Sequence, residues 1–267
     1  MTNKDKDGRE IARENEVRVL RALHRFGWLR TRDLAALVWL RWARSPVGEP
    51  DLTPILPTAS GLRMAQRTLK RLRDKRFVLS SRAPDGSLIY ALAEAGARLL
   101  QHIGVTAVTG KDLMRTFSSA HYRHRCVANE IAVGAIIEGF RIATEREIAQ
   151  GLWLGGTDGI AGKKPDVLIR AGDTAWWVEV ERSRKNVKDY AALLKWLSTA
   201  AQDAFRAAGP LLLGEKVRWG KVIFICTPAF QAKLTRDLTA AGWKKIHLDT
   251  LIAFNTSLYS FKDITFS

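Results

Sequence analysis

Apolar side chains recur at helical spacing along the first quarter of the chain and predict three helices. The first covers residues 11–26 and the second residues 31–39. Four prolines within residues 45–57 exclude a regular helix there, because proline lacks an amide hydrogen and clashes with the preceding turn. The third helix then begins at Thr58 or Ser60, since both residue types cap helix N-termini.

The third predicted helix has a strongly cationic outer face. Its apolar residues form one stripe, and its polar face carries Arg63, Gln66, Arg67, Lys70 and Arg73. Residues 77–81 and 88–91 alternate as strands on either side of a Pro-Asp-Gly turn. A basic helix is therefore followed by a β-hairpin, and Arg82 lies in that hairpin.

The order helix, helix, basic helix, hairpin over residues 11–104 resembles a winged helix-turn-helix. The resemblance implies that the basic helix lies in the major groove, with its arginines and lysine on phosphates and Gln66 at base edges. Arg82 in the wing would touch the DNA backbone. The alternative is a winged helix used for protein contact or dimerisation, with its arginines solvated.

Beyond a stretch of small residues at 104–110 the pattern changes and predicts a second domain. We expect a flexible segment at 1–10, a DNA-binding domain at 11–106 and a second domain at 107–267. Its predicted elements are a helix at 121–139, strands at 141–147, 165–171 and 175–181, a helix at 187–207, a strand at 221–227, a helix at 231–241 and a strand at 246–254. The fold class is mixed α/β with a central mixed sheet in the second domain.

Charge narrows the choice of partner. Lysine and arginine outnumber acidic residues 43 to 27, a formal net charge of +16, which attracts a polyanion at long range. DNA is the expected partner; an acidic membrane surface is the alternative. Because no apolar run is long enough to span a bilayer and the N-terminus lacks a signal-peptide core, we expect a cytoplasmic protein. Cys126 and Cys226 are expected to be buried thiols, since they lack paired metal-ligand spacing.

Acidic residues on two neighbouring predicted strands form the main candidate for chemistry. Glu179 and Glu181 are two apart on one strand and point to the same side. If the strand that follows Asp166 pairs with this one, three carboxylates converge into a hard-oxygen cluster suited to Mg²⁺ or Mn²⁺. The alternative is that Glu181 pairs at the strand end with Arg182, Arg184 or Lys185, while Asp166 is exposed.

The arrangement Pro165, Asp166 and Glu179 resembles the PD-(D/E)xK nuclease superfamily, in which an aspartate after proline and a glutamate on the next strand hold the metal. Glu181 departs from that pattern, because the motif commonly carries lysine there. The cation that polarises phosphate or water must then come from elsewhere, and we expect Lys185, with Arg182 and Arg184 as competitors. Glu145 or, by preference, Glu147 is the expected upstream acid that joins the metal through water.

The segment His121-Tyr-Arg-His-Arg-Cys-Val-Ala-Asn-Glu130, together with Glu-x-Glu in place of Glu-x-Lys, resembles the replication-relaxation family. This family includes restriction-endonuclease-like relaxases of mobilisable plasmids. The resemblance implies that His124 is the family's histidine, a group able to carry a proton near neutral pH. Relaxases also use tyrosine nucleophiles, but the surroundings of Tyr122 and Tyr190 assign neither.

The resulting hypothesis is a Mg²⁺-dependent DNA endonuclease, of nicking or relaxase type, that serves plasmid or mobile-element mobilisation or replication. Its partners would be DNA and either a second copy of the chain or other mobilisation proteins. The alternative is a non-catalytic DNA-binding regulator with a degenerate nuclease fold, which the missing lysine at position 181 favours.

Overall fold

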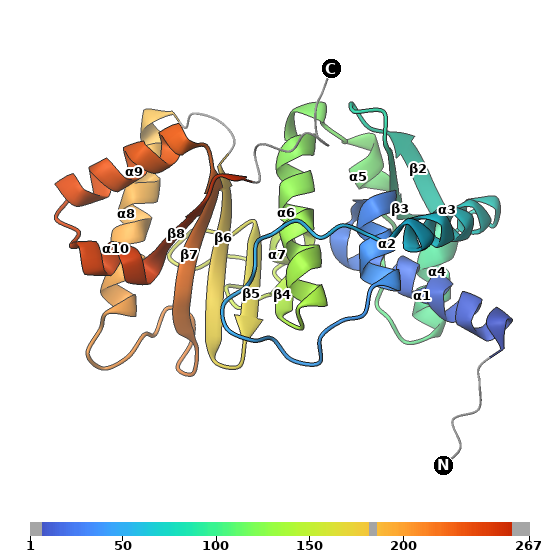
Figure 1. Cartoon of the computed structure of the whole chain (residues 1–267), viewed down its shortest axis with the longest axis horizontal. Coiled ribbons are helices and arrows are strands. Elements are labelled where there is room, and N and C mark those ends of the chain that lie inside the picture. Colours follow the sequence, from blue (N-terminus) through green and yellow to red (C-terminus); the bar gives the residue numbers. More distant parts are fainter. Residues whose placement is uncertain (1–6, 182–185, 258–267) are drawn as a thin grey trace, which may run out of the picture. The chain divides into compact units, whose positions relative to one another are not determined.

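The computed structural model describes residues 7–181 and 186–257, and its chain divides into two compact units (Figure 1). One unit comprises residues 7–41 and 55–123, and the other residues 42–54, 124–181 and 186–257. The proline-rich segment belongs to the second unit: the Ala43 amide donates to the Ile137 carbonyl, and the Asp51 amide to the Glu138 carboxylate. The predicted domain boundary at 106/107 and the flexible segment 1–10 stay predictions.

The first unit combines helices with a small antiparallel sheet in the order β1-β3-β2. Buried leucines of the helices, among them Leu20, Leu34 and Leu69, form its core. Its elements are α1 (Gly8–Phe26), β1 (Trp28–Arg30), α2 (Thr31–Trp39), α3 (Ala59–Asp74), β2 (Val78–Arg82), β3 (Leu88–Leu92), α4 (Glu94–His102) and α5 (Lys111–Arg115). The three predicted helices and the hairpin are confirmed.

Strand β1 was not predicted. It has three residues, all buried, so it lacks the alternation that marks a half-buried strand. The cost of burying the Arg30 guanidinium is offset by Asp33, whose carboxylate accepts hydrogen bonds from Nε at 3.0 Å and Nη2 at 2.8 Å. Asp33 also accepts from the Arg30 amide, so it stabilises the start of α2 from within the first turn.

The second unit contains a five-stranded mixed sheet in the order β4-β5-β6-β7-β8. β4, β5 and β6 pair antiparallel, whereas β6, β7 and β8 pair parallel, with α8 as the crossover from β6 to β7. Its elements are most of α6 (Ser119–Ile137), then β4 (Arg141–Ala143), α7 (Glu145–Ala149), β5 (Val167–Ala171), β6 (Thr174–Glu181), α8 (Val187–Ala204), β7 (Arg218–Cys226), α9 (Pro228–Ala240), α10 (Lys245–Leu251) and β8 (Ile252–Asn255).

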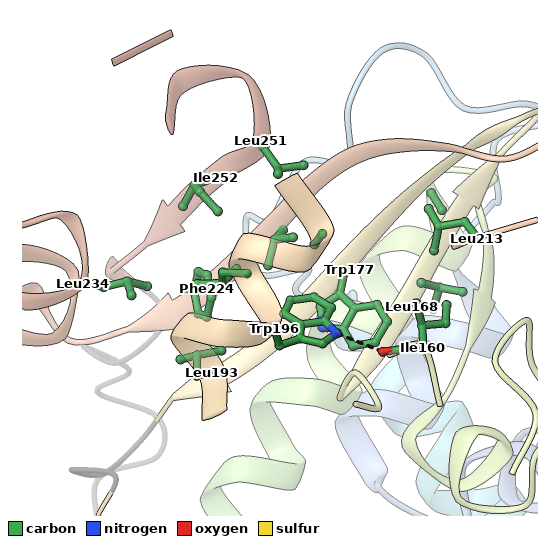
Figure 2. Close-up of a cluster of buried hydrophobic side chains, with 14 of the residues drawn as sticks. Ile160, Leu168, Trp177, Leu193, Trp196, Leu213, Phe224, Leu234, Leu251 and Ile252 are labelled. Atoms are coloured by element: carbon green, nitrogen blue, oxygen red, sulfur yellow. Dashed lines mark hydrogen bonds between the residues drawn. The ribbon is translucent and has the colours of Figure 1, made fainter. Parts of the chain in front are cut away.

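Helices cover both faces of this sheet, α8, α9 and α10 on one side and α6 on the other (Figure 1). The core between the sheet and α8 is built around Trp177 and Trp196, whose rings lie 4.6 Å apart, with Phe224 beside them (Figure 2). The Trp196 indole also donates to the Ile160 carbonyl at 2.9 Å, which ties the loop before β5 to this core.

Two predicted strands of the second unit were partly wrong. The strand at 141–147 ends at Ala143, because Thr144 and Glu147 form a capping box that starts α7. The strand at 246–254 is the helix α10 followed by the short strand β8. Only from Ile252 onward does the backbone pair with β7. Short segments of this kind carry too few residues for periodicity to distinguish helix from strand.

Among the ten helices of residues 7–181 and 186–257, none has both the length and the apolar character that crossing a bilayer requires.

Thr58 is the residue that caps α3, since its side chain accepts from the Gly61 amide at 3.0 Å. We predict that Thr58→Ala lowers the free energy of unfolding by about 1 kcal/mol, because that amide loses its partner. Ser60→Ala is the matched control and should change the stability by less than half as much. Urea unfolding of both variants measures the difference, and equal losses would contradict the assignment.

Candidate functional site

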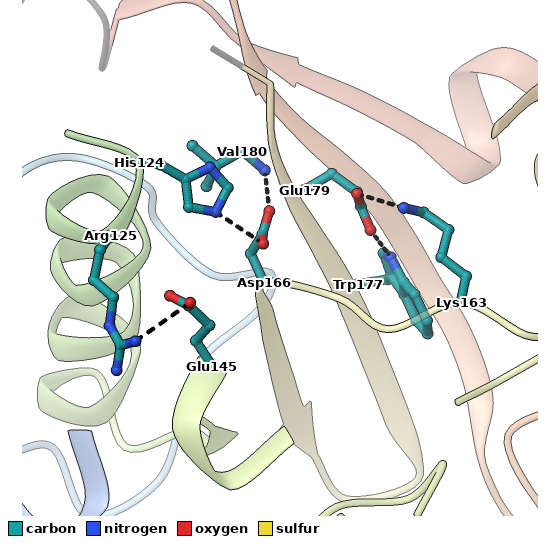
Figure 3. Close-up of polar contacts among 8 residues, drawn as sticks. All are labelled: His124, Arg125, Glu145, Lys163, Asp166, Trp177, Glu179 and Val180. Carbon is teal, nitrogen blue, oxygen red and sulfur yellow. Dashed lines mark hydrogen bonds and ion pairs between the residues drawn. The ribbon is translucent and has the colours of Figure 1, made fainter. Parts of the chain in front are cut away.

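The candidate site of the second unit lies where β5 and β6 meet at one end of their hairpin (Figure 3). Asp166 directly precedes β5, and Glu179 lies on β6. His124 reaches Asp166 from α6, and Lys163 reaches Glu179 from the loop before β5. Four titratable side chains, from α6, from the segment before β5 and from β6, therefore surround one end of the hairpin.

Asp166 is held by two hydrogen bonds. Its Oδ1 lies 3.0 Å from His124 Nε2, and its Oδ2 accepts from the Val180 amide at 2.7 Å. The second bond extends the pairing of β6 beyond the end of β5, with a side chain in place of a backbone carbonyl. About a fifth of the Asp166 side chain, 21%, is exposed to solvent.

The pKa of His124 is set by burial and by the carboxylates around the ring. Burial lowers the pKa of His124, but the hydrogen bond and charge of Asp166, with the charges of Glu145 and Glu179, outweigh burial and raise the pKa overall. The ring therefore holds its proton more readily at neutral pH than a free histidine does. An imidazolium in this position donates through Nε2 to Asp166.

Glu179 is almost completely buried, with 4% of the residue exposed. Its Oε1 accepts from the Trp177 indole at 2.6 Å, and its Oε2 accepts from Lys163 Nζ at 2.8 Å. Burial raises the pKa of Glu179 to about 7, an effect that Lys163 opposes and the charge of Asp166 adds to. The charge of Asp166 therefore acts on Glu179.

The two candidates for an upstream acid differ in position. Glu147 is occupied in the capping box of α7, where its Oε2 accepts from the Thr144 amide at 2.9 Å. Glu145 instead faces α6, with Oε1 at 3.3 Å from Arg125 Nη1, and its charge acts on His124. Its Oε2 is buried and accepts no hydrogen bond in the described part of the chain. Glu145 therefore lies nearer the site than the preferred Glu147.

Glu181 is buried on the same face of β6 as Glu179 and lies opposite Cys226 of β7. Burial, assisted by the charge of Glu181, raises the pKa of Cys226 to about 12. The prediction that Glu179 and Glu181 lie on the same face of one strand is confirmed. Both cysteines are buried free thiols, as predicted. The role of Glu181 stays a prediction. Arg182, Arg184 and Lys185 lie outside the described residues.

The donors at the site match a hard cation in chemistry. Asp166, Glu179 and the unpartnered Oε2 of Glu145 offer carboxylate oxygens, which Mg²⁺ prefers. Within residues 7–181 and 186–257, however, no three His, Cys, Asp or Glu side chains form a group that could hold a metal ion. The predicted cluster of Asp166, Glu179 and Glu181 is therefore not assembled among the described residues, and metal binding at this site stays a prediction.

Lys163 is the site residue that sequence reasoning missed. It stands three positions before Asp166, in the sequence Lys-Lys-Pro-Asp, of which only Pro165 and Asp166 entered the predicted site. Nothing in the spacing indicates that the loop returns this lysine to the sheet, since that depends on the backbone of residues 159–163. The proximity of a lysine to Pro-Asp was the only available signal.

The two tyrosines have structural contacts. Tyr122 is fully buried, stacks on Trp28 and donates to Asp85 at 2.9 Å. Tyr190 donates to Asp237 at 2.9 Å, with Lys233 Nζ 3.3 Å from its ring centroid. Neither contact involves Asp166 or Glu179, so the geometry assigns no covalent nucleophile.

A second candidate surface lies on α3 of the first unit. A groove of about 410 Å³ runs between α3 and the β2–β3 hairpin and is lined by Gln66, Lys70 and Arg73 together with Leu88 and Tyr90. The predicted DNA-binding residues Arg63, Gln66, Arg67, Lys70 and Arg73 are all exposed on α3, and Arg82 is exposed on β2.

The basic residues of α3 fall into two groups. Arg71 and Lys75, just beyond its end, pair with Glu16 of α1 at 3.1 and 3.0 Å. Lys70 approaches Asp74 at 3.7 Å. Within the described chain, Arg63, Arg67 and Arg73 have no acidic partner. These three guanidinium groups are therefore available to an external anion.

Comparison with known proteins adds one finding. Residues 52–203 match the family model described as replication-relaxation. The chain belongs to the replication-relaxation family. The match spans more than half of the chain and includes α3, the β2–β3 hairpin and every described residue of the site. No curated protein and no solved structure matches the chain. In this replication-relaxation protein the matched region therefore contains both candidate surfaces.

The raised pKa of Glu179 predicts a pH dependence of stability. The folded chain binds this proton more tightly than the unfolded chain, so stability is lost as pH rises from about 4.5 to about 7 and stays lost above. Glu179→Gln cannot ionise and should be more stable than wild type at pH 8 by roughly 3 kcal/mol, and equal to it near pH 4.

Urea unfolding between pH 4 and pH 8, in EDTA, measures this difference. Glu215→Gln, an exposed carboxylate of the same unit, is the matched control and should follow the wild-type curve. Parallel curves for wild type and Glu179→Gln would contradict the raised pKa.

Proposed function

We propose that this chain is a DNA-binding, divalent-metal-dependent endonuclease of nicking or relaxase type that acts in the replication or mobilisation of plasmids or mobile elements. The observation that carries the proposal is that Asp166, bound to His124, and Glu179, bound to Lys163, lie at the same end of the β5–β6 hairpin, with the charge of Asp166 acting on Glu179. The family's description, replication-relaxation, supports the biological process.

The order of elements in the second unit supports the nuclease part of the proposal. The order is the helix α6, the antiparallel strands β4, β5 and β6 with the short helix α7 between β4 and β5, the crossover helix α8 and the parallel strand β7. That order resembles the PD-(D/E)xK superfamily, whose aspartate and glutamate occupy the places of Asp166 and Glu179. In this proposal those two carboxylates hold Mg²⁺ or Mn²⁺.

A bound divalent ion would activate water and neutralise charge on the phosphate. The protein's own groups have separate tasks. Asp166 is fixed by the Val180 amide and by His124, so its orientation is set before DNA binds. His124 holds a proton at Nε2 and is the group of the site best suited to exchange one near neutral pH. The Trp177 indole keeps the Glu179 carboxylate in one orientation.

The first unit supports the DNA-binding part. The succession of α2, the basic α3 and the β2–β3 hairpin resembles a winged helix-turn-helix, and the groove between helix and hairpin is lined by Gln66, Lys70 and Arg73. Arg63 and Arg67 would contact phosphates, because guanidinium groups bind them with paired hydrogen bonds. Arg82 in the hairpin would touch the backbone.

One observation favours a second candidate function, a DNA-binding regulator without nuclease activity. Glu179 and Asp166 already have cationic or protonated partners in Lys163 and His124, and the described residues form no three-membered metal group. A nuclease fold that has lost its activity would show the same paired carboxylates and, among the described residues, the same lack of a metal-binding group. The nicking experiment below distinguishes the two functions.

We predict that the wild-type chain nicks supercoiled plasmid DNA with Mg²⁺ or Mn²⁺ and not in EDTA. Asp166→Asn, which keeps the shape but loses the charge, should slow nicking on the order of 100-fold or more. The measured quantity is the rate of conversion from supercoiled to open-circular plasmid.

Asp173→Asn is the matched control, because Asp173 lies at the other end of the same hairpin and is exposed. Its nicking rate should equal that of wild type. DNA binding without metal-dependent nicking would establish the regulator instead, and equal nicking by wild type and Asp166→Asn would remove Asp166 from the site.

The DNA-binding surface predicts a change in salt dependence. Replacing both Arg63 and Arg67 with alanine should reduce the slope of log affinity against log salt by about 2, since each lost phosphate contact releases about one counterion fewer. Fluorescence anisotropy on a labelled duplex measures the slope. Arg98→Ala removes one positive charge from an exposed position on α4 and should leave the slope almost unchanged. An unchanged slope in the double variant would contradict the role of α3.

A further inference from the structure

A buried glutamate stands at position 181, where the related nuclease motif commonly has its lysine. The β6 strand therefore lacks the ammonium that would stand beside Glu179. In the structure an ammonium nevertheless lies beside Glu179, and it comes from Lys163, at 2.8 Å from Oε2. Along the chain, Lys163 lies before β5, whereas position 181 lies at the end of β6.

The backbone before β5 places Lys163 by a tight turn. Ile160 and Lys163 exchange backbone hydrogen bonds of 2.8 and 3.1 Å, and the two residues between them both have positive φ, 50° at Ala161 and 76° at Gly162. Positive φ at both central positions is the mark of a type I′ turn. An alanine in this conformation is strained, and such strain persists where the surrounding structure holds it.

The surrounding structure is the Trp196 side chain of α8. Its indole donates to the Ile160 carbonyl at 2.9 Å and fixes the first residue of the turn. The same ring lies 5.8 Å below Lys163 Nζ, a distance at which a cation is attracted to an aromatic face. One tryptophan thus holds both the turn and the lysine that it presents.

The partial exposure of Lys163 would allow its ammonium to contact a phosphate from solvent. Its side chain is 23% exposed, in contrast to 6% for Glu179, so part of the Lys163 side chain reaches solvent. Asp166, whose side chain is 21% exposed, follows it by three residues. A phosphate that approached Asp166 from solvent would meet the lysine at the same end of the hairpin.

We propose that Lys163 supplies, from the loop before β5, the catalytic cation that position 181 lacks, and that its ammonium contacts an oxygen of the scissile phosphate. The inference rests on the proposed nuclease function. It replaces the expectation that Lys185 does this work. Lys163 pairs with Glu179 in the free protein and would reach the phosphate when DNA binds.

The test is chemical replacement of the ammonium. Lys163→Cys introduces a thiol that 2-bromoethylamine alkylates, with loss of bromide, to a lysine analogue in which sulfur replaces one methylene. Iodoacetamide gives a neutral group of similar size at the same place. The two native cysteines are fully buried and protected in the folded chain. Lys164→Cys, on the exposed neighbouring lysine, is the matched control.

We expect Lys163→Cys to lower the nicking rate at saturating plasmid on the order of 100-fold, with DNA affinity changed less than threefold. Aminoethylation should restore most of the rate, and the neutral group should not. Lys164→Cys should nick like wild type in all three forms. A role in packing alone would be served equally by both alkylated forms, so equal rates from them would overturn the proposal.

A second measurement does not depend on activity. Lys163→Cys should lower the stability to urea, and the loss should disappear in a Glu179→Gln background, because the buried carboxylate no longer needs a cation. An equal loss in both backgrounds would overturn the pairing. If wild type nicks and Lys163→Cys nicks at the same rate, only this inference fails. If wild type itself does not nick, the proposed function fails and takes this inference with it.

Discussion

The buried carboxylate of Glu179, on the central strand β6, needs partners that replace its lost hydration, and the packing of the second unit around it supplies them. Removing an ionised carboxylate from water costs several kcal/mol unless hydrogen bonds and opposite charge replace the lost hydration. The Trp177 indole and the Lys163 ammonium provide both. Their positions depend in turn on the packing of α8, since Trp196 contacts the Trp177 ring and also fixes the turn that carries Lys163. The hydrophobic core and the polar site therefore share the same tryptophans.

On the first unit, ion pairs divide the basic residues of α3 into those with an acidic partner and those without one in the described chain. Glu16 of α1 binds Arg71 and Lys75, whereas the remaining arginines of α3 are exposed and have no acidic partner among the described residues. Part of the positive charge of α3 is thereby paired within the unit, and part of it faces solvent. Exposed ion pairs of this kind add little stability, so their main effect is to decide which guanidinium groups stay accessible.

Much of this architecture could be predicted from the sequence, because long segments with clear periodicity specify their own structure. The amphipathic pattern of α3 and the alternation on β6, with Glu179 and Glu181 on one face, are of this type. Short elements could not be predicted: β1 is buried throughout, and α7 depends on a capping box between Thr144 and Glu147. Lys163 was not predicted as a site residue for a different reason. Its place beside Glu179 follows from positive φ angles in a turn and from a tryptophan on a later helix.

The hydrogen bond from the Val180 amide to Asp166 joins the site to the edge of the β6 ladder. Any ligand that draws Oδ2 of Asp166 to itself leaves that amide without an acceptor, and any ligand that takes only Oδ1 leaves it protected. The rate at which this one backbone hydrogen exchanges with solvent deuterium is therefore a local gauge of how Asp166 is engaged. This exchange can be followed without turnover and without a label, so the Val180 amide reports on the occupancy of the Asp166 carboxylate.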